Sequence, residues 1–201
     1  MFLPFHQFKR VQNKYCCSYF GSNNDYLILL KNLRPYIEQQ FNGIKIYIAC
    51  KDESYYLLHD EPRVVKKSEF VKQDFCYVRE IKVNLQKKIH PIHELIIESD
   101  IKIPCFELNK CINSNRVSVF TEGIYPTKSL DFNQIENLKK IIQRKGLTYV
   151  DKLEDANQIY SVENEVFVAS IFKGIKCTLI ESGLGTSFYK SLFPELNLIS
   201  L

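Results

Sequence analysis

The sequence predicts an α/β protein built from two halves, each organised around a largely parallel sheet. Apolar runs of strand length alternate with amphipathic helical patterns, and this alternation restarts after a polar, turn-rich stretch at residues 109–115. Hydrophobic residues make up 45% of the 201 residues and charged residues 25%, which is the composition of a packed globular protein. Because strands that alternate with helices favour parallel pairing, we expect two short Rossmann-like halves, residues 1–114 and 115–201.

The first half opens with a βαβ pattern. The apolar run Tyr15–Phe20 stops at Gly21-Ser22-Asn23-Asn24, a cluster of turn and cap formers, and indicates a strand followed by a loop. From Asp25 onward, apolar residues recur at spacings of three and four up to Phe41, which predicts a helix that Pro35 bends or splits. Residues 44–50 are β-branched and aromatic and predict the second strand.

The remaining elements are predicted from the same kinds of signal. In the rest of the first half we expect a short helix at 54–58, a strand at 75–83, a helix at 90–97 and a strand at 102–106. In the second half we expect strands at 116–120, 147–150, 158–162, 175–180 and 196–201, with helices at 131–145, 163–172 and 187–193. Asp131 is the predicted N-cap of its helix, and Gly146 and Gly174 are predicted to end the helices before them.

Composition excludes several classes of protein. No apolar run approaches the roughly 20 residues of a membrane span, and the first residues do not form a signal peptide, so we expect a soluble, cytoplasmic protein. The net charge of +4 is far below the clustered basicity of a nucleic-acid binder. The seven cysteines fall mainly in strand-like runs, and Cys50 and Cys177 are therefore predicted to be buried and reduced.

Metal sites also lack support in the sequence. There is no Cys-x-x-Cys, and no Asp-x-Asp follows a strand to hold a metal against a diphosphate. His90 and His93 have the spacing of some metal pairs, but Pro91 lies between them and no acidic ligand accompanies them. We expect neither a metal site nor a bound cofactor.

Three loops lie where a parallel sheet binds ligands, at the carboxyl ends of strands and before helices. Asp25 follows the first strand and is either a general base or the cap of the next helix. Lys128 precedes a helix and either neutralises a diphosphate or is a surface lysine. The turn that contains Gly183, Gly185 and Thr186 either surrounds a phosphate with backbone amides or is a plain tight turn, since it lacks the P-loop lysine.

Taken together, these loops resemble the heptosyltransferase-type family of bacterial glycosyltransferases, which have the GT-B architecture of two facing Rossmann-like domains. The N-terminal match runs through Gly21-Ser22-Asn23-Asn24-Asp25-Tyr26, Leu33-Arg34-Pro35 and residues 41–47. The C-terminal match consists of residues 126–132 and of residues 159–169 with Gly174. Asn24 replaces the family's glycine, Glu163 and Asn164 replace its Asp and Thr, and the usual helix histidine is missing.

The resemblance implies a metal-independent, inverting sugar transfer from a nucleotide-sugar to the hydroxyl of a glycan, glycolipid or glycoprotein. It implies an acceptor-side domain at 1–114 and a donor-binding domain at 115–201, with the donor in the cleft between them. It gives Asp25 the role of base, and Lys128, Glu163, Asn164 and the Gly183–Thr186 turn the role of donor contacts. The alternatives are a non-catalytic nucleotide-binding or regulatory module of the same fold, and a different nucleotide-dependent enzyme such as an epimerase.

Overall fold

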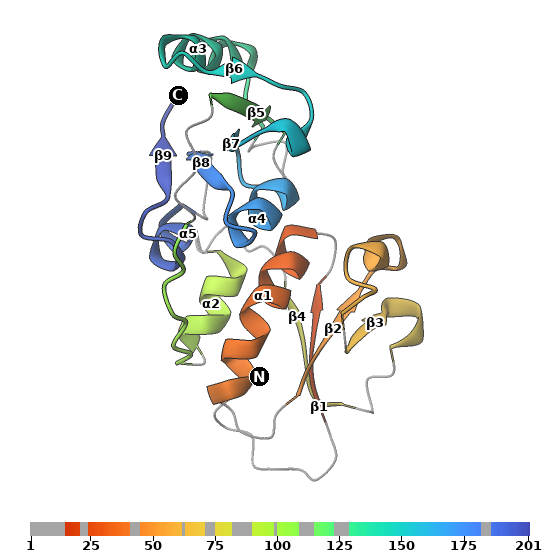
Figure 1. Ribbon diagram of the computed structural model, residues 1–201. Coiled ribbons are helices and arrows are strands. Elements are labelled where there is room, and N and C mark those ends of the chain that lie inside the picture. The colour runs from red at the N-terminus through yellow and green to blue at the C-terminus, as the bar shows by residue number, and fades with distance from the viewer. Residues whose placement is uncertain are drawn as a thin grey trace. The chain divides into compact units, whose positions relative to one another are not determined.

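The computed structural model describes residues 15–20, 24–40, 45–61, 63–70, 75–81, 90–98, 100–108, 115–122, 129–181 and 186–201. The chain divides into two compact units, Met1–Pro104 and Cys105–Leu201, whose strands form two separate sheets (Figure 1). Every described strand pair is parallel, which confirms the mixed α/β class with parallel sheets.

The first unit contains a four-stranded sheet in the order β3-β2-β1-β4. Its strands are β1 (Tyr15–Phe20), β2 (Ile46–Cys50), β3 (Val64–Lys66) and β4 (Phe75–Ile81). Its helices are α1 (Asn24–Gln40) and α2 (Pro91–Glu98), with 3-10 turns at Asp52–Leu57 and Lys67–Glu69. Both α-helices lie on one side of the sheet (Figure 1). The apolar positions of α1 that the sequence predicts are buried, with Leu27, Leu30, Leu33 and Ile37 at most 2% exposed.

Of the two effects expected of Pro35, a bend or a split, the split does not occur, because α1 is continuous through this residue. The predicted strand at 102–106 is also wrong, because no strand lies between residues 100 and 108. The side chain of Gln40 takes the place of a neighbouring strand there. Its Oε1 accepts from the Lys102 N–H at 2.8 Å and its Nε2 donates to the Lys102 carbonyl at 2.7 Å. Both backbone groups of Lys102 are thereby satisfied without a ladder.

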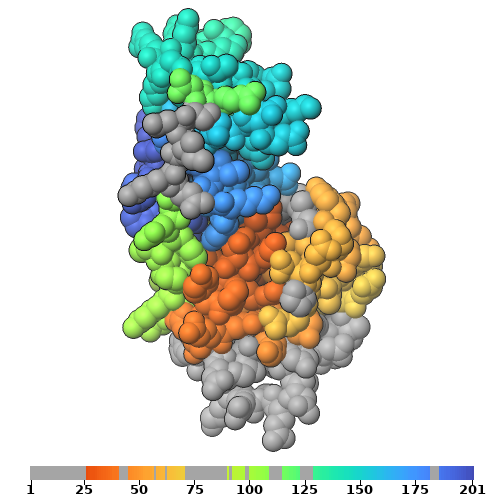
Figure 2. Space-filling model, viewed as in Figure 1, coloured from red at the N-terminus to blue at the C-terminus, as the bar shows by residue number. Residues whose placement is uncertain are grey.

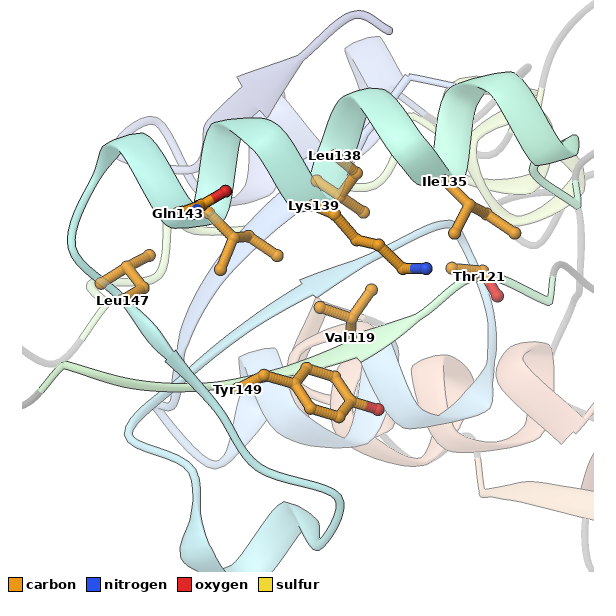
Figure 3. Close-up of a pocket in the computed structure, with 9 residues that line it drawn as sticks. Val119, Thr121, Ile135, Leu138, Lys139, Gln143, Leu147 and Tyr149 are labelled. Atoms are coloured by element: carbon orange, nitrogen blue, oxygen red, sulfur yellow. The ribbon is translucent and has the colours of Figure 1, made fainter.

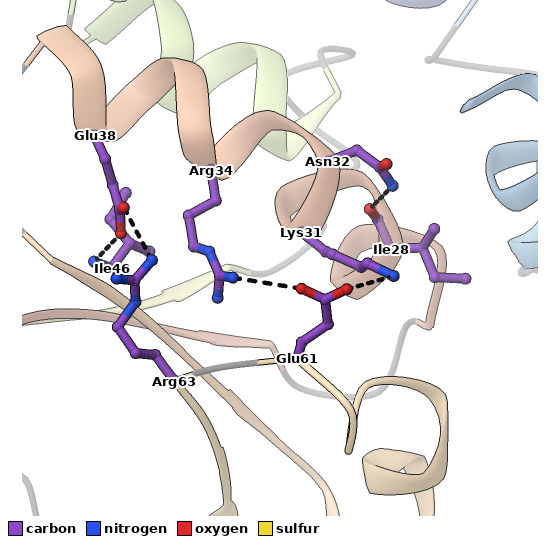
Figure 4. A network of polar contacts seen from close by, with 8 residues as sticks. All are labelled: Ile28, Lys31, Asn32, Arg34, Glu38, Ile46, Glu61 and Arg63. Carbon is purple, nitrogen blue, oxygen red and sulfur yellow. Dashed lines mark hydrogen bonds and ion pairs between the residues drawn. The ribbon is translucent and has the colours of Figure 1, made fainter. Parts of the chain in front are cut away.

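A network of ion pairs fixes α1 to the amino ends of β2 and β3 (Figure 4). The Glu38 carboxylate accepts the Ile46 N–H at 2.7 Å and pairs with Arg63 at 2.9 Å. Arg34 is 5% exposed and reaches Glu61 at 3.6 Å. Arg63 has a positive φ of 65°, an unfavourable conformation for a side-chain-bearing residue, and its carbonyl accepts the Ile48 N–H at 3.0 Å. These contacts lie at the end of the strands away from the loops expected to bind ligands.

The second unit contains a five-stranded sheet in the order β6-β5-β7-β8-β9. Its strands are β5 (Arg116–Phe120), β6 (Thr148–Tyr149), β7 (Gln158–Ser161), β8 (Lys176–Ile180) and β9 (Asn197–Ile199). Its helices are α3 (Phe132–Arg144), α4 (Glu165–Phe172) and α5 (Thr186–Leu192), with a 3-10 turn at Leu153–Asp155. Helix α3 covers one face of the sheet, and α4 and α5 cover the other (Figure 1).

Both faces of this sheet bury apolar side chains. On the α3 face, Val117 and Tyr160 pack with Leu138 and Ile142 in one core cluster. On the other face, the rings of Phe167 in α4 and Tyr189 in α5 meet edge to face with centroids 5.0 Å apart, and both residues are fully buried. The sheet is therefore the central layer of three.

The predicted helix ends of this unit are confirmed. Asp131 caps α3 through a capping box, in which its side chain accepts the Gln134 N–H at 2.9 Å and the Gln134 side chain accepts the Asp131 N–H at 3.0 Å. Gly146 and Gly174 follow α3 and α4 with φ values of 64° and 75°. Glycine adopts this left-handed conformation at no steric cost, so the chain can turn there.

The division between the units lies before the join expected at residues 114 and 115. Residues 105–108 pack with the second unit, where the Phe106 N–H donates to the Leu192 carbonyl at 2.7 Å. The Phe106 ring lies 5.3 Å from the rings of Phe172 and Phe193. Cys50 and Cys177 are buried, as predicted from their apolar strands.

Candidate functional site

Each sheet contains a switch point, a pair of neighbouring strands from which the chain continues toward opposite edges of the sheet. In the second sheet, the chain passes from β5 to β6 on one side, whereas β7 is followed by β8 on the other. In the first sheet, β2 and β3 lie on one side of β1 and β4 on the other. Ligands of open α/β sheets bind beside such switch points, at the carboxyl ends of the two strands concerned. We therefore take these two edges as the candidate sites.

At the switch point of the second sheet, Asn164 joins the ends of β5 and β7. Its Oδ1 accepts the Phe167 N–H at 2.9 Å, which caps α4, and also accepts from Ser161 Oγ at 3.3 Å. Its Nδ2 donates to the Glu122 carbonyl at 3.0 Å, just after β5. The side chain of Asn164, which the family resemblance predicted to contact the donor, therefore holds two parts of the protein together at this edge. Asparagine is one of the residues preferred at N-caps, so the sequence already contained a signal for this role.

Glu163 occupies the position between β7 and this cap. It is 3% exposed, and Ser161 two residues earlier is fully buried. Burial of a carboxyl group is costly unless its charge is compensated, and the positive end of the following helix α4 favours a negative charge here. The structure thus brings Glu163, Asn164 and the carbonyl of Glu122 together at one switch point. Neither Ser161 nor Glu122 is among the predicted site residues, although Ser161 lies in the matched segment 159–169.

The other residues proposed to bind the donor are described only in part. Thr186 is half-buried and is the first residue of α5, which follows β8, the neighbour of β7. Lys128, Gly183 and Gly185 lie outside the described residues. The N-terminus of α5 is therefore the one part of the predicted glycine-rich turn that the structure describes.

At the switch point of the first sheet, Asp25 lies in the first turn of α1, immediately after the loop that follows β1. The structure describes the backbone of Asp25 and not its side chain. The next residue, Tyr26, is buried and meets the ring of His90 edge to face with centroids 5.0 Å apart. This contact brings the start of α1 next to the start of α2, which follows β4.

Of the two histidines that have metal-pair spacing, His90 has a structural role. His90 is 1% exposed, and its Nδ1 accepts the Ile92 N–H at 3.2 Å, so it caps α2. Burial, and then the neighbouring His90, lower the pKa of His93 below its usual value of 6.5. Among the described residues, no three His, Cys, Asp or Glu side chains form a group that could hold a metal ion.

Comparison with known proteins gives a likeness at the level of the fold alone. The sequence matches no family model, and no curated protein matches it. The structure is similar to that of TibC, an iron-containing dodecameric glycosyltransferase from enterotoxigenic E. coli H10407, with a TM-score of 0.55 and 9% sequence identity. The likeness covers 86% of this chain, which spans 60% of that chain. It shows that the two-sheet α/β architecture is one found in a glycosyltransferase.

In the described part of the chain, no helix is both long and apolar enough to cross a bilayer.

Proposed function

We propose that this chain is a glycosyltransferase that moves a sugar from a nucleotide-sugar to a hydroxyl group of a glycan, glycolipid or glycoprotein. The observation that carries the proposal is the position of two switch points in two parallel sheets, each followed by residues suited to this chemistry. Asp25 follows β1 in the first sheet, and Glu163 follows β7 in the second. The likeness to a glycosyltransferase of the same architecture supports this reading.

In the second unit, the buried Glu163 is suited to the nucleoside part of the donor. A carboxylate accepts hydrogen bonds from ribose hydroxyls, as acidic residues do in dinucleotide-binding folds, whereas it repels a diphosphate. The diphosphate therefore belongs beside Lys128 and the turn that contains Gly183 and Gly185. The amide groups at the start of α4 and α5 add the positive ends of two helices to this edge.

In the first unit, Asp25 acts as the general base. Its carboxylate removes the proton from the acceptor hydroxyl while the acceptor oxygen attacks the anomeric carbon, and the bond from that carbon to the diphosphate breaks. Attack from the face opposite the leaving group inverts the anomeric centre. Lys128 and the helix amides offset the negative charge that develops on the departing nucleoside diphosphate, so no metal is required in this scheme.

The decisive experiment incubates the full chain with a mixed panel of sugar-nucleotides and candidate acceptors and identifies products by mass spectrometry. We expect a glycosylated acceptor and a free nucleoside diphosphate. Asp25→Asn should abolish turnover and leave nucleotide affinity unchanged, because the amide keeps the shape of the side chain and cannot take the proton. Hydrolysis or epimerisation of the donor without transfer would contradict the proposal.

A second measurement addresses the donor site. Lys128→Ala should weaken binding of a nucleoside diphosphate by about 1–3 kcal/mol, the usual cost of losing a charge-assisted hydrogen bond, and should affect the nucleoside much less. Calorimetry measures both affinities. If the mutant binds the diphosphate as tightly as the wild type, the donor site lies elsewhere.

A non-catalytic nucleotide-binding module is the second candidate, and the bonds of Asn164 favour it. Both polar atoms of this side chain hold the local structure together, which leaves the edge with fewer groups to stabilise a departing diphosphate. Such a module would bind nucleotides with the same dependence on Lys128 and form no product with any donor. The Asp25→Asn variant would then behave as the wild type in every assay.

A further inference from the structure

A short stretch of chain connects the two units. The first unit ends at Pro104 and the second begins at Cys105. From residue 100 to residue 108 the chain forms neither a helix nor a strand, so no ladder of hydrogen bonds holds its backbone. Each end of the stretch is nevertheless anchored in its own unit. The positions of these two anchors determine how much of the connection can turn.

The anchor on the first unit is the side chain of Gln40. It accepts the Lys102 N–H at 2.8 Å and donates to the Lys102 carbonyl at 2.7 Å, so both backbone groups of Lys102 are held. The residue before it, Ile101, is buried, and its N–H donates to the Ile96 carbonyl at 3.0 Å. The chain is therefore fixed to the first unit as far as Lys102.

The anchor on the second unit begins three residues later. The Cys105 thiol donates to a carbonyl of α5 at 3.6 Å, and the Phe106 N–H donates to the Leu192 carbonyl at 2.7 Å. The Phe106 ring packs against the rings of Phe172 and Phe193, with centroids 5.3 Å away in both cases. Because it combines hydrogen bonds with aromatic packing, this anchor is the stronger of the two.

The two residues between the anchors, Ile103 and Pro104, both have restricted backbones. The ring of proline fixes φ of Pro104 near about −65°. A residue that precedes proline is kept out of the helical region, so Ile103 is confined to extended conformations. Rotation of one unit against the other is therefore left mainly to ψ of Pro104 and φ of Cys105.

We propose that residues 103–105 form a stiff hinge that restricts the relative orientation of the two units. From Lys102 to Cys105 the chain spans at most about 11 Å, and few of its torsions are free to turn. The hinge does not depend on the proposed sugar transfer. That reaction depends on the hinge, because Asp25 belongs to the first unit and Glu163 to the second, and a short tether raises the effective concentration of one edge at the other.

The experiment measures the distance between the units of the full chain by single-molecule fluorescence energy transfer. The dyes are attached through ketone-bearing unnatural residues that replace Tyr56 of the first unit, 63% exposed, and Phe132 of the second, 75% exposed. Phe132 lies on α3, whose teal side chains are at the surface in the space-filling view (Figure 2). We expect one narrow distance distribution. Pro104→Gly frees φ at this position and lifts the restriction on the preceding residue, so the distribution should broaden. Insertion of two glycines after Pro104 should broaden it further. The matched control is Pro194→Gly, an exposed proline within the second unit, which should leave the distribution unchanged.

Two further variants test the anchors. Gln40→Ala frees Lys102, whereas Phe106→Ala frees the chain as far as the buried Leu108, so the second variant should broaden the distribution more than the first. The proposal is overturned if Pro104→Gly gives the wild-type distribution, because the connection would then not orient the units. It is also overturned if the wild type is already as broad as the insertion variant, or if Pro194→Gly broadens the distribution as much as Pro104→Gly. Thermal unfolding followed by circular dichroism checks that each variant is folded.

Discussion

Replacing Asn164 with alanine removes three hydrogen bonds at the candidate donor edge, of which the longest, from Ser161 Oγ, leaves that hydroxyl its bond to the Val162 carbonyl. Loss of the α4 cap, the bond from the Phe167 N–H, should cost about 1 kcal/mol. Loss of the bond from Nδ2 to the Glu122 carbonyl should cost about 1 kcal/mol more. We therefore expect Asn164→Ala to lower the free energy of unfolding by about 2 kcal/mol, or the melting temperature by about 4–8 °C for a chain of this length.

Aspartate at this position separates the two contacts. Asn164→Asp keeps the oxygen that caps α4 and gains from the positive end of the helix, but it loses the donor to Glu122. The free energy of unfolding of Asn164→Asp should therefore lie between those of the wild type and the alanine variant. Urea unfolding followed by circular dichroism measures all three proteins, and Asn133→Ala on the exposed surface of α3 should stay within about 0.5 kcal/mol of the wild type.

Two results would refute the reasoning. One is a loss below about 0.5 kcal/mol for Asn164→Ala, which is less than either contact should contribute on its own. The other is equal stability of the aspartate and alanine variants, which would mean that the cap contributes nothing.

Three further predictions follow from contacts and burial. The pKa of His93 is lowered in the folded state, so the folded protein binds this proton less readily than the unfolded chain does. The free energy of unfolding should therefore be unaffected by His93 above pH 6.5 and should decrease as the pH falls below that value. The variant His93→Gln should flatten this part of the stability curve, and an unchanged curve would contradict the assignment. Gln40→Ala should lower the free energy of unfolding by about 1 kcal/mol, because both hydrogen bonds to the Lys102 backbone disappear. Gln40→Glu keeps the acceptor oxygen and should lower the free energy of unfolding by less in the same assay. Burial, and then Asp52, raise the pKa of the Cys50 thiol. Peptide mapping after brief treatment of the native protein with iodoacetamide should therefore find Cys105 modified well before Cys50, and equal rates would argue against the burial of β2.

Much of the local structure could be predicted because its signals are short in range. The capping box of Asp131 and the glycine after α3 are set by residues within one turn of the helix, so the sequence alone locates both ends. The spacing of Leu27, Leu30 and Leu33 likewise predicts the buried face of α1. Even the position of Glu163 after a buried strand follows from the pattern of residues 158–172.

The contacts that depend on distant segments could not be read in this way. Strand β3 is three residues long and is stabilised by pairing with β2, so its own sequence carries little signal. Lys102 is kept out of a sheet by Gln40, which precedes it by 62 residues. His90 has the spacing of a metal ligand, yet the fold makes it the cap of α2 and packs it against Tyr26.

The sequence by itself determined the α/β class, the buried faces of the main helices and the loops at which to look for chemistry. The order of the strands, and with it the two switch points, was decided only by the tertiary structure. Helix periodicity and capping are properties of neighbouring residues, whereas strand order depends on which distant segments pair, and an apolar strand pairs equally well with several others. The same reason applies to the pocket between α3, β5 and β6 (Figure 3). Its apolar lining residues are typical of a core in the sequence, and Leu138 and Ile142 are indeed buried, whereas Val119, Ile135 and Leu147 are only half-buried.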